Sequence, residues 1–105
     1  MRKSENNMLF LEEGDKFQIE YFKTMPSKKY PDRMMGKILT KKAEEVFTSS
    51  AKIVKIIDEL MKDTDVNLSE ITFEVINAGK FNDKPVLSLR ADNERVQLKI
   101  IKILF

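Results

Sequence analysis

The sequence contains no cysteine, histidine or tryptophan, and the missing residue types exclude several kinds of site. Without cysteine there is no disulfide framework and no thiolate nucleophile. Without histidine the chain lacks the commonest general base near neutral pH, and with both absent the usual triads and zinc sites cannot be built. No phosphate-binding loop replaces them, because Phe81 stands after Gly79-Lys80 where serine or threonine would be required. We therefore expect a protein that is not an enzyme and uses no cofactor.

Glycine and proline are also scarce, with three of each in 105 residues, so long flexible linkers are not expected. No apolar run is long enough to cross a membrane, and the run at residues 8–11 is too short for a signal-peptide core. Apolar residues make up 42% and charged residues 34% of the chain, a globular balance. We expect one cytoplasmic domain over residues 1–105, with residues 1–7 frayed and no membrane contact.

Hydrophobic periodicity predicts a hairpin and then a long helix in the first part of the chain. Apolar residues alternate with polar ones over residues 9–11 and 17–21, on either side of a turn at Gly14-Asp15. From about residue 40 to about residue 63, apolar residues recur at three- and four-residue steps. This spacing predicts an amphipathic helix with Thr40 as its N-cap.

Three further strands are predicted after the helix, at residues 71–75, 86–90 and 96–100, where alternation returns. Short connections between them favour an antiparallel meander. The predicted order is therefore ββαβββ, an α+β fold with a single antiparallel sheet and one long helix packed on one face. We expect polar side chains of mixed sign on the uncovered face, with Phe22 among them.

The last segment departs from simple alternation. Ile100 and Ile101 are adjacent, so the apolar residues change faces at this point. The β-branched content favours a strand over residues 95–105, with a helix as the alternative. In a strand, either a bulge re-aims the side chains or both faces are buried. Burial of the second face by another chain predicts a homodimer through Ile101, Ile103 and Phe105.

One stretch partly matches a twelve-residue calcium loop. Its positions 1, 3, 5 and 12 are Asp63, Asp65, Asn67 and Glu74. The match fails where the loop requires glycine, because that position is Leu68, and the residues that should open a second helix are typical of a strand. We expect a polar connection between helix and strand, and we assign no metal site.

Positive charge is concentrated in one segment. The chain carries a formal net charge of +2, but residues 23–42 contain seven lysines and arginines and a single acidic residue. Pro26, Pro31 and Gly36 predict a basic loop over residues 24–38. We expect a contact site made of this segment together with cations at the sheet edge: Lys23, Lys28, Lys29, Tyr30, Arg33, Lys37, Lys41, Lys42, Arg90, Arg95 and Lys99.

Two functions are compatible with such a site. The first is nucleic-acid binding, to a single strand or to the backbone, because cations attract phosphates and Tyr30 offers a stacking platform. Lys41 and Lys42 are expected at the positive end of the helix dipole, where cations are unfavourable. This position suggests that they serve a purpose other than stability. The second is a protein-interaction module or inhibitor, for instance a phage-type protein that blocks a host nucleic-acid enzyme. Met34 and Met35 would then anchor the partner within a basic rim.

Overall fold

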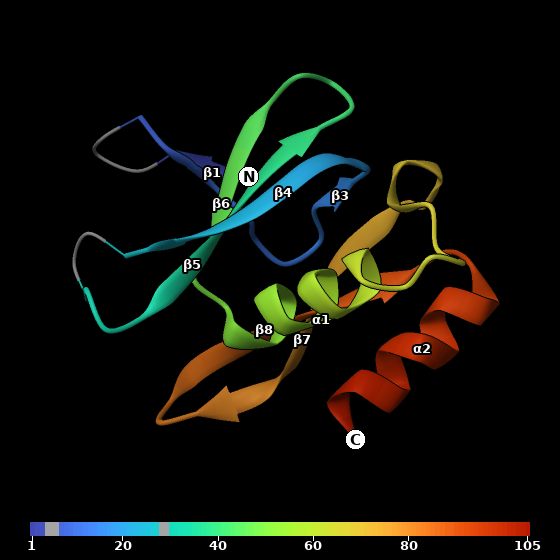
Figure 1. Cartoon of the computed structure of the whole chain (residues 1–105). Helices are drawn as coiled ribbons and strands as arrows, with labels where there is room; N and C mark the ends of the chain where they lie inside the picture. The colour runs from blue at the N-terminus through green and yellow to red at the C-terminus, as the bar shows by residue number, and fades with distance from the viewer. Residues whose placement is uncertain (4–6, 28–29) are drawn as a thin grey trace.

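The computed structural model describes residues 1–3, 7–27 and 30–105, and it confirms the expected α+β class. The elements follow one another along the chain in the order β1 (Arg2–Lys3), β2 (Leu9–Phe10), β3 (Lys16–Phe17), β4 (Ile19–Pro26), β5 (Met34–Thr40), β6 (Glu45–Thr48), α1 (Ala51–Met61), the 3-10 helix η1 (Leu68–Glu70), β7 (Phe73–Phe81), β8 (Lys84–Ala91) and α2 (Glu94–Leu104). The strands form a five-stranded sheet, β1-β2-β6-β5-β4, and a three-stranded sheet, β3-β7-β8 (Figure 1). The prediction of one sheet with one helix is therefore wrong.

The first strands do not form the predicted hairpin with each other. Strand β2 pairs in parallel with β6, and β3 pairs antiparallel with β7 in the other sheet. The turn between them is held by β7, because the Gly14 N–H donates to the Val75 carbonyl at 2.8 Å and the Val75 N–H donates to the Asp15 carbonyl at 2.8 Å. The turn predicted at Gly14-Asp15 is present, but the hydrogen bonds that hold it come from the distant strand β7.

Residues 24–38, predicted as a loop, belong mainly to a long hairpin of β4 and β5. Their pairing runs from Ile19↔Thr40 to Pro26↔Met34. Pro26 is tolerated because it ends β4, an edge strand of its sheet, where a missing N–H leaves no neighbour unpaired. Gly36 marks close packing and not a loose turn, since a Cβ there would lie 2.8 Å from Cε1 of Phe22.

The helix predicted from residue 40 begins only at Ala51. Residues 45–48 form β6 instead, paired with β5, and Thr40 accepts a hydrogen bond from the Glu44 N–H in the preceding turn. The observed N-cap is Ser50, whose hydroxyl accepts from the Ile53 N–H and donates to the Leu87 carbonyl of β8 at 2.7 Å. The helix therefore starts where a cap and a tertiary hydrogen bond coincide.

The strand predicted over residues 95–105 is wrong, and the helical alternative holds. Asn93 caps α2 by accepting from the N–H groups of Arg95 and Val96. Val96 and Ile100 are buried one helical turn apart, so the adjacent Ile101 simply belongs to a different side of the helix. Capping and helical spacing here outweigh the β-branched content.

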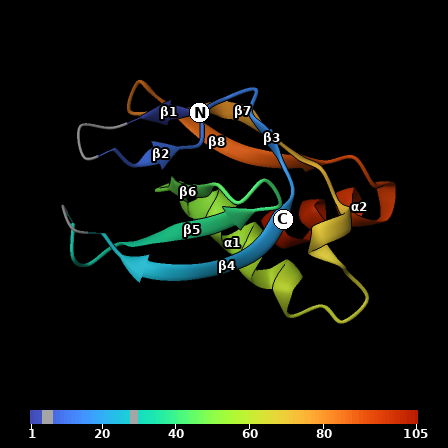
Figure 2. The same ribbon diagram turned by 90° about the horizontal axis from the view of Figure 1, so that it is seen from above.

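The main apolar core of the described residues lies around α1. Figures 1 and 2 show α1 in the angle between the two sheets, with α2 beside it. The buried stripe of α1 consists of Ile53, Ile56, Ile57 and Leu60. It packs in a cluster with residues from the inner faces of both sheets: Ile38, Val46, Phe73, Val75 and Leu89. Phe22, expected on a solvent-exposed face, is 3% exposed and belongs to this core.

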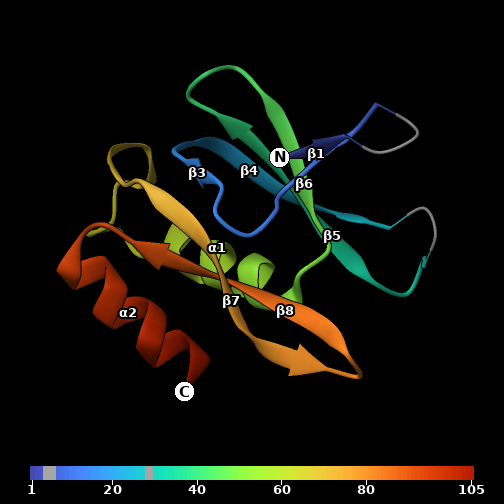
Figure 3. The same ribbon diagram turned by 180° about the vertical axis from the view of Figure 1, so that it is seen from behind.

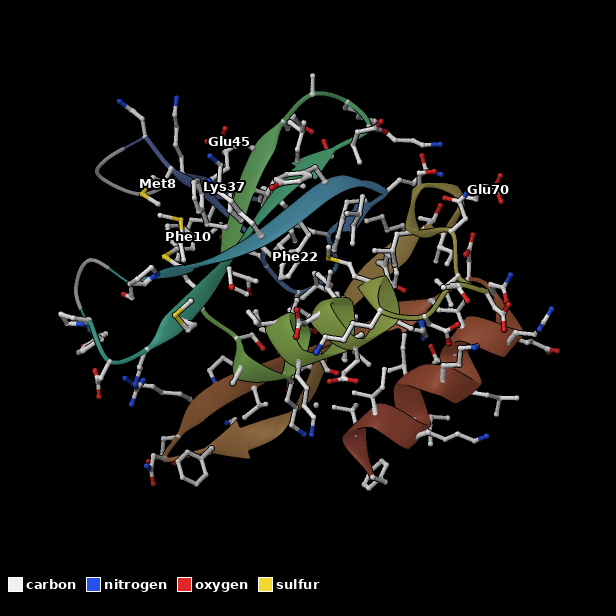
Figure 4. All side chains as sticks on the ribbon, in the orientation of Figure 1. Met8, Phe10, Phe22, Lys37, Glu45 and Glu70 are labelled. Atoms are coloured by element: carbon white, nitrogen blue, oxygen red, sulfur yellow. The ribbon has the colours of Figure 1, made fainter. Side chains whose placement is uncertain are left out.

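The opposite face of the five-stranded sheet carries a smaller apolar group. Met35 and Phe47 are buried but lie outside the main core, and the Phe10 ring is 6.1 Å from that of Phe47. Lys37 and Glu45, on the neighbouring strands β5 and β6, form an ion pair at 3.3 Å on the same face (Figure 4). Long side chains thus cover part of a sheet face that no helix covers among the described residues.

We expect Gly36→Ala to lower the free energy of unfolding by about 1–3 kcal/mol. The added methyl group would lie 2.8 Å from the Phe22 ring and 3.2 Å from Cγ2 of Val54, both in a packed region. Urea unfolding measures the loss, and a Phe22→Leu background should make it smaller because the ring is removed. Equal stability of Gly36→Ala and wild type would contradict this packing.

Candidate functional site

Two adjoining hollows lie between the β4–β5 hairpin, the start of α1 and the β7–β8 hairpin. One has a volume of about 780 Å³ and the other about 560 Å³, and both are lined by Arg33, Ser49, Ala51 and Lys84. Figures 1 and 3 show the tips of both hairpins on the same side of the molecule, with the start of α1 between them. We call the two hollows together the two-hairpin cleft.

The charge of the cleft is strongly positive. Among the described residues, five cations and one carboxylate line it: Arg2, Arg33, Lys52, Lys55, Lys84 and Asp58. Asp58 is already engaged, with an oxygen 3.4 Å from Nζ of Lys62. Within the described part of the chain, Lys52, Lys55 and Lys84 form no ion pair. Most of the positive charge is therefore uncompensated.

Helix α1 adds to this positive potential. Lys52 and Lys55 lie at its start, and its first turn holds no acidic residue. The N-terminal end of a helix dipole is positive, so cations are disfavoured there. The sequence suggested this position for Lys41 and Lys42, but the structure places Lys52 and Lys55 at the helix start instead. Local stability does not explain this arrangement.

Each hairpin brings an aromatic ring to the cleft. Tyr30 is 49% exposed, and the guanidinium carbon of Arg33 lies 5.3 Å from the centre of its ring. Phe81 is 72% exposed and pairs with Lys84 across the turn that joins β7 and β8. That turn has two central residues, Asn82 and Asp83, with φ of 51° and 62°, as a tight hairpin turn requires.

The structure distributes the residues of the predicted basic segment over several places. Tyr30, Arg33, Met34 and Met35 line the cleft, whereas Lys28 and Lys29 lie outside the described residues. Two more face each other across β4 and β5, away from α1: Lys23 and Lys37. The remaining two occupy the turn after β5, about 20 Å along the strand from its start: Lys41 and Lys42.

The predicted cations at the sheet edge lie near α2 or on the outer face of the small sheet. Arg90 forms an ion pair with Glu74, and Lys99 forms one with Asp63. Arg95 is exposed in the first turn of α2. Figures 1 and 3 place α2 at the end of the molecule away from the hairpin tips. The structure thus does not bring these three residues together with Arg33.

Sequence reasoning missed half of the cleft. The overlooked residues come from three separate segments, β1, α1 and the β7–β8 hairpin: Arg2, Lys52, Lys55, Phe81 and Lys84. A correctly placed helix start would have revealed two lysines at the wrong end of a dipole. The others carry no local signal, because only the packing of α1 between the sheets brings the N-terminal segment and the β7–β8 hairpin to Arg33.

The expected dimer residues are divided between surface and core. Ile101 is 45% exposed and Phe105 is 99% exposed, and with Leu98 at 61% they form an apolar stripe along α2. Ile103 instead packs against the main core. Two of the three predicted residues are therefore available for contact, and Leu98 joins them because the segment is a helix.

The calcium-loop residues serve separate structural roles. Asp63 accepts from the Asp65 N–H at 2.9 Å and pairs with Lys99, while Asn67 caps η1. Glu74 lies on β7, paired with Arg90. Within the described residues no group of three acidic side chains is placed to hold a metal ion.

No protein-family model and no curated protein matches this sequence. Within residues 1–3, 7–27 and 30–105, no helix is long and apolar enough to cross a membrane. The side chains of the two-hairpin cleft are thus the basis for the function considered next.

The contact between Asp63 and Lys99 predicts that stability depends on acid pH. Two hydrogen bonds hold the pKa of Asp63 below its ordinary value of 3.8. The bond from Lys99 has the larger effect and the bond from the Asp65 N–H the smaller one. A lowered pKa in the folded state gives stabilisation that is present above the ordinary pKa and is lost as the pH falls through the lowered one.

We therefore expect Asp63→Asn to reduce stability near neutral pH, with the difference from wild type shrinking in strong acid. Urea midpoints measured across this pH range test it. Asp65→Asn is the matched control, because Asp65 forms no ion pair among the described residues. A difference between Asp63→Asn and wild type that is constant with pH would contradict the assignment.

Proposed function

We propose that this protein binds nucleic acid, with the phosphate backbone held in the two-hairpin cleft. The supporting observation is the grouping of five cations with one carboxylate, itself paired, in two adjoining hollows. Phosphate backbones attract such groups, and the release of condensed counterions drives the binding. The contact site is therefore centred on Arg33 and Lys84, and not on the whole segment 23–42.

The origin of these cations supports a functional role over simple solubility. They come from β1, the β4–β5 hairpin, α1 and the β7–β8 hairpin, which are far apart in the sequence. Like charges that the fold brings together repel one another, which lowers stability. Solvated lysines on an ordinary surface are interspersed with acidic residues. A fold that gathers them in a hollow is typical of a site that binds an anionic ligand.

Binding, and not catalysis, is the proposed activity. The hydroxyl groups that line the cleft include those of Ser49 and Ser50, but the Ser50 hydroxyl is engaged at both the Ile53 N–H and the Leu87 carbonyl. The chain has no histidine to activate a hydroxyl group as a nucleophile. The cleft offers cations and aromatic rings, which are groups that bind and orient.

We expect the double variant Arg33→Glu, Lys84→Glu to weaken binding of labelled oligonucleotides at least about tenfold and to reduce the salt slope by about one to two. Fluorescence anisotropy across a salt series measures both. The matched control is Lys41→Glu, Lys42→Glu, which makes the same charge change in the turn at the other end of β5. Equal losses in the two variants would contradict a site in the cleft and indicate a general effect of net charge.

A protein-interaction role is the second candidate, favoured by the exposed stripe of Leu98, Ile101 and Phe105 on α2. Exposed apolar stripes often mark contact surfaces. If it mediates self-association, light scattering should show a dimer at high concentration that Leu98→Ser, Ile101→Ser converts to a monomer. A wild-type protein that stays monomeric would exclude self-association through α2.

A further inference from the structure

We infer that the nucleic acid bound in the two-hairpin cleft is single-stranded, and that Phe81 holds one of its unpaired bases by stacking. This inference rests on the proposed function. Single-stranded and double-stranded nucleic acid differ in whether the faces of their bases are accessible to a protein side chain. The aromatic rings of the cleft, and not its cations, carry the inference.

Phe81 is placed for contact with a ligand and not for packing. Its side chain is 72% exposed, although burying a phenylalanine ring stabilises a protein by about 1.5–3 kcal/mol. A lone exposed apolar residue is common on protein surfaces. Phe81 differs because it lines the 560 Å³ hollow together with Arg2, Arg33 and Lys84. Arg33 and Lys84 form no ion pair within the described part of the chain. An apolar ring beside them suits a ligand that is anionic and has flat apolar faces.

The two hairpins present the same pair of groups. Arg33 lies over the ring of Tyr30 on the β4–β5 hairpin, and Lys84 pairs in register with Phe81 on the β7–β8 hairpin. Each nucleotide of a single strand likewise offers a phosphate and a base with a π-face. Aromatic stacking with cation contacts along the backbone is the mode by which proteins hold single strands without reading their sequence.

A double helix would not use these rings. Its bases are stacked on each other inside the duplex, so their faces cannot reach an aromatic side chain unless the base is flipped out. The hollows of about 560 and 780 Å³ are of the size that holds small ligands, which suits individual nucleotides. Duplex would meet the cations at the rim only, and Phe81 and Tyr30 would contribute nothing to its binding.

The test compares three labelled probes of about 20 nucleotides, at fixed salt: a single strand of thymidines, an abasic deoxyribose-phosphate strand, and a duplex. The abasic strand keeps the phosphates and removes the bases. We expect the wild-type protein to bind the single strand at least about five times more tightly than the abasic strand, because a stacked base adds this much or more. A uridine strand, tested in parallel, extends the measurement to RNA.

Phe81→Ala should weaken binding of the single strand by about 5- to 150-fold and leave the abasic strand and the salt slope unchanged. Phe81→Trp should retain the affinity, since the larger ring still stacks. Phe105→Ala is the matched control, because Phe105 is also exposed, at 99%, but follows α2 and does not line the cleft. Urea unfolding should show all three variants folded like wild type.

The outcomes separate the stacking role of Phe81 from the proposed function. If Phe81→Ala binds the single strand like wild type while Arg33→Glu, Lys84→Glu does not, the stacking role is overturned and the cleft remains a backbone site. Equal affinity for the abasic and thymidine strands, or for duplex and single strand, would overturn the stacking role in the same way. If wild-type protein binds none of the probes, both proposals fail, and the cations would have to serve a different anionic partner such as an acidic protein surface.

Discussion

The burial of α1 between the two sheets is the constraint on which the rest of the structure depends. Ile53, Ile56, Ile57 and Leu60 are all 1% exposed or less, so this one helix supplies the centre of the core. The Ser50 hydroxyl fixes its start by donating to the Leu87 carbonyl of β8. A helix held in this position brings both long hairpins to the same end of the molecule, and its own first turn lies between them.

The cleft follows from that packing. Arg33 and Phe81 lie 48 positions apart in the chain, yet they line one hollow because each hairpin packs against a different side of α1. The gathered cations repel one another, and two of them oppose the dipole of α1. The core around α1 offsets this loss of stability. The apolar stripe of α2 shares no residue with the lining of the cleft.

Residue patterns predicted the positions of β7, β8 and the buried stripe of α1 better than they predicted which strands pair. Alternation located β7 and β8, and three- and four-residue spacing located the buried stripe of α1. The basic segment stands out in the sequence by its charge, but its residues alternate along paired strands and therefore point to different faces. Lys37 is paired with Glu45 on one face, while Arg33 lines the cleft beyond the strand. Among the described cations of this segment, only Arg33 lines the cleft.

The sequence by itself determined the α+β class, through local periodicity, and the lack of thiol and imidazole side chains, through composition. Only the tertiary structure decided which strands pair, where α1 begins and which cations meet. Leu9 lies beside Val46 and Phe17 beside Phe73, and no local pattern specifies such distant partners. The same holds for the end of the chain: an isoleucine-rich segment can be strand or helix, and the Asn93 cap together with packing of Val96 and Ile100 against the core selects the helix.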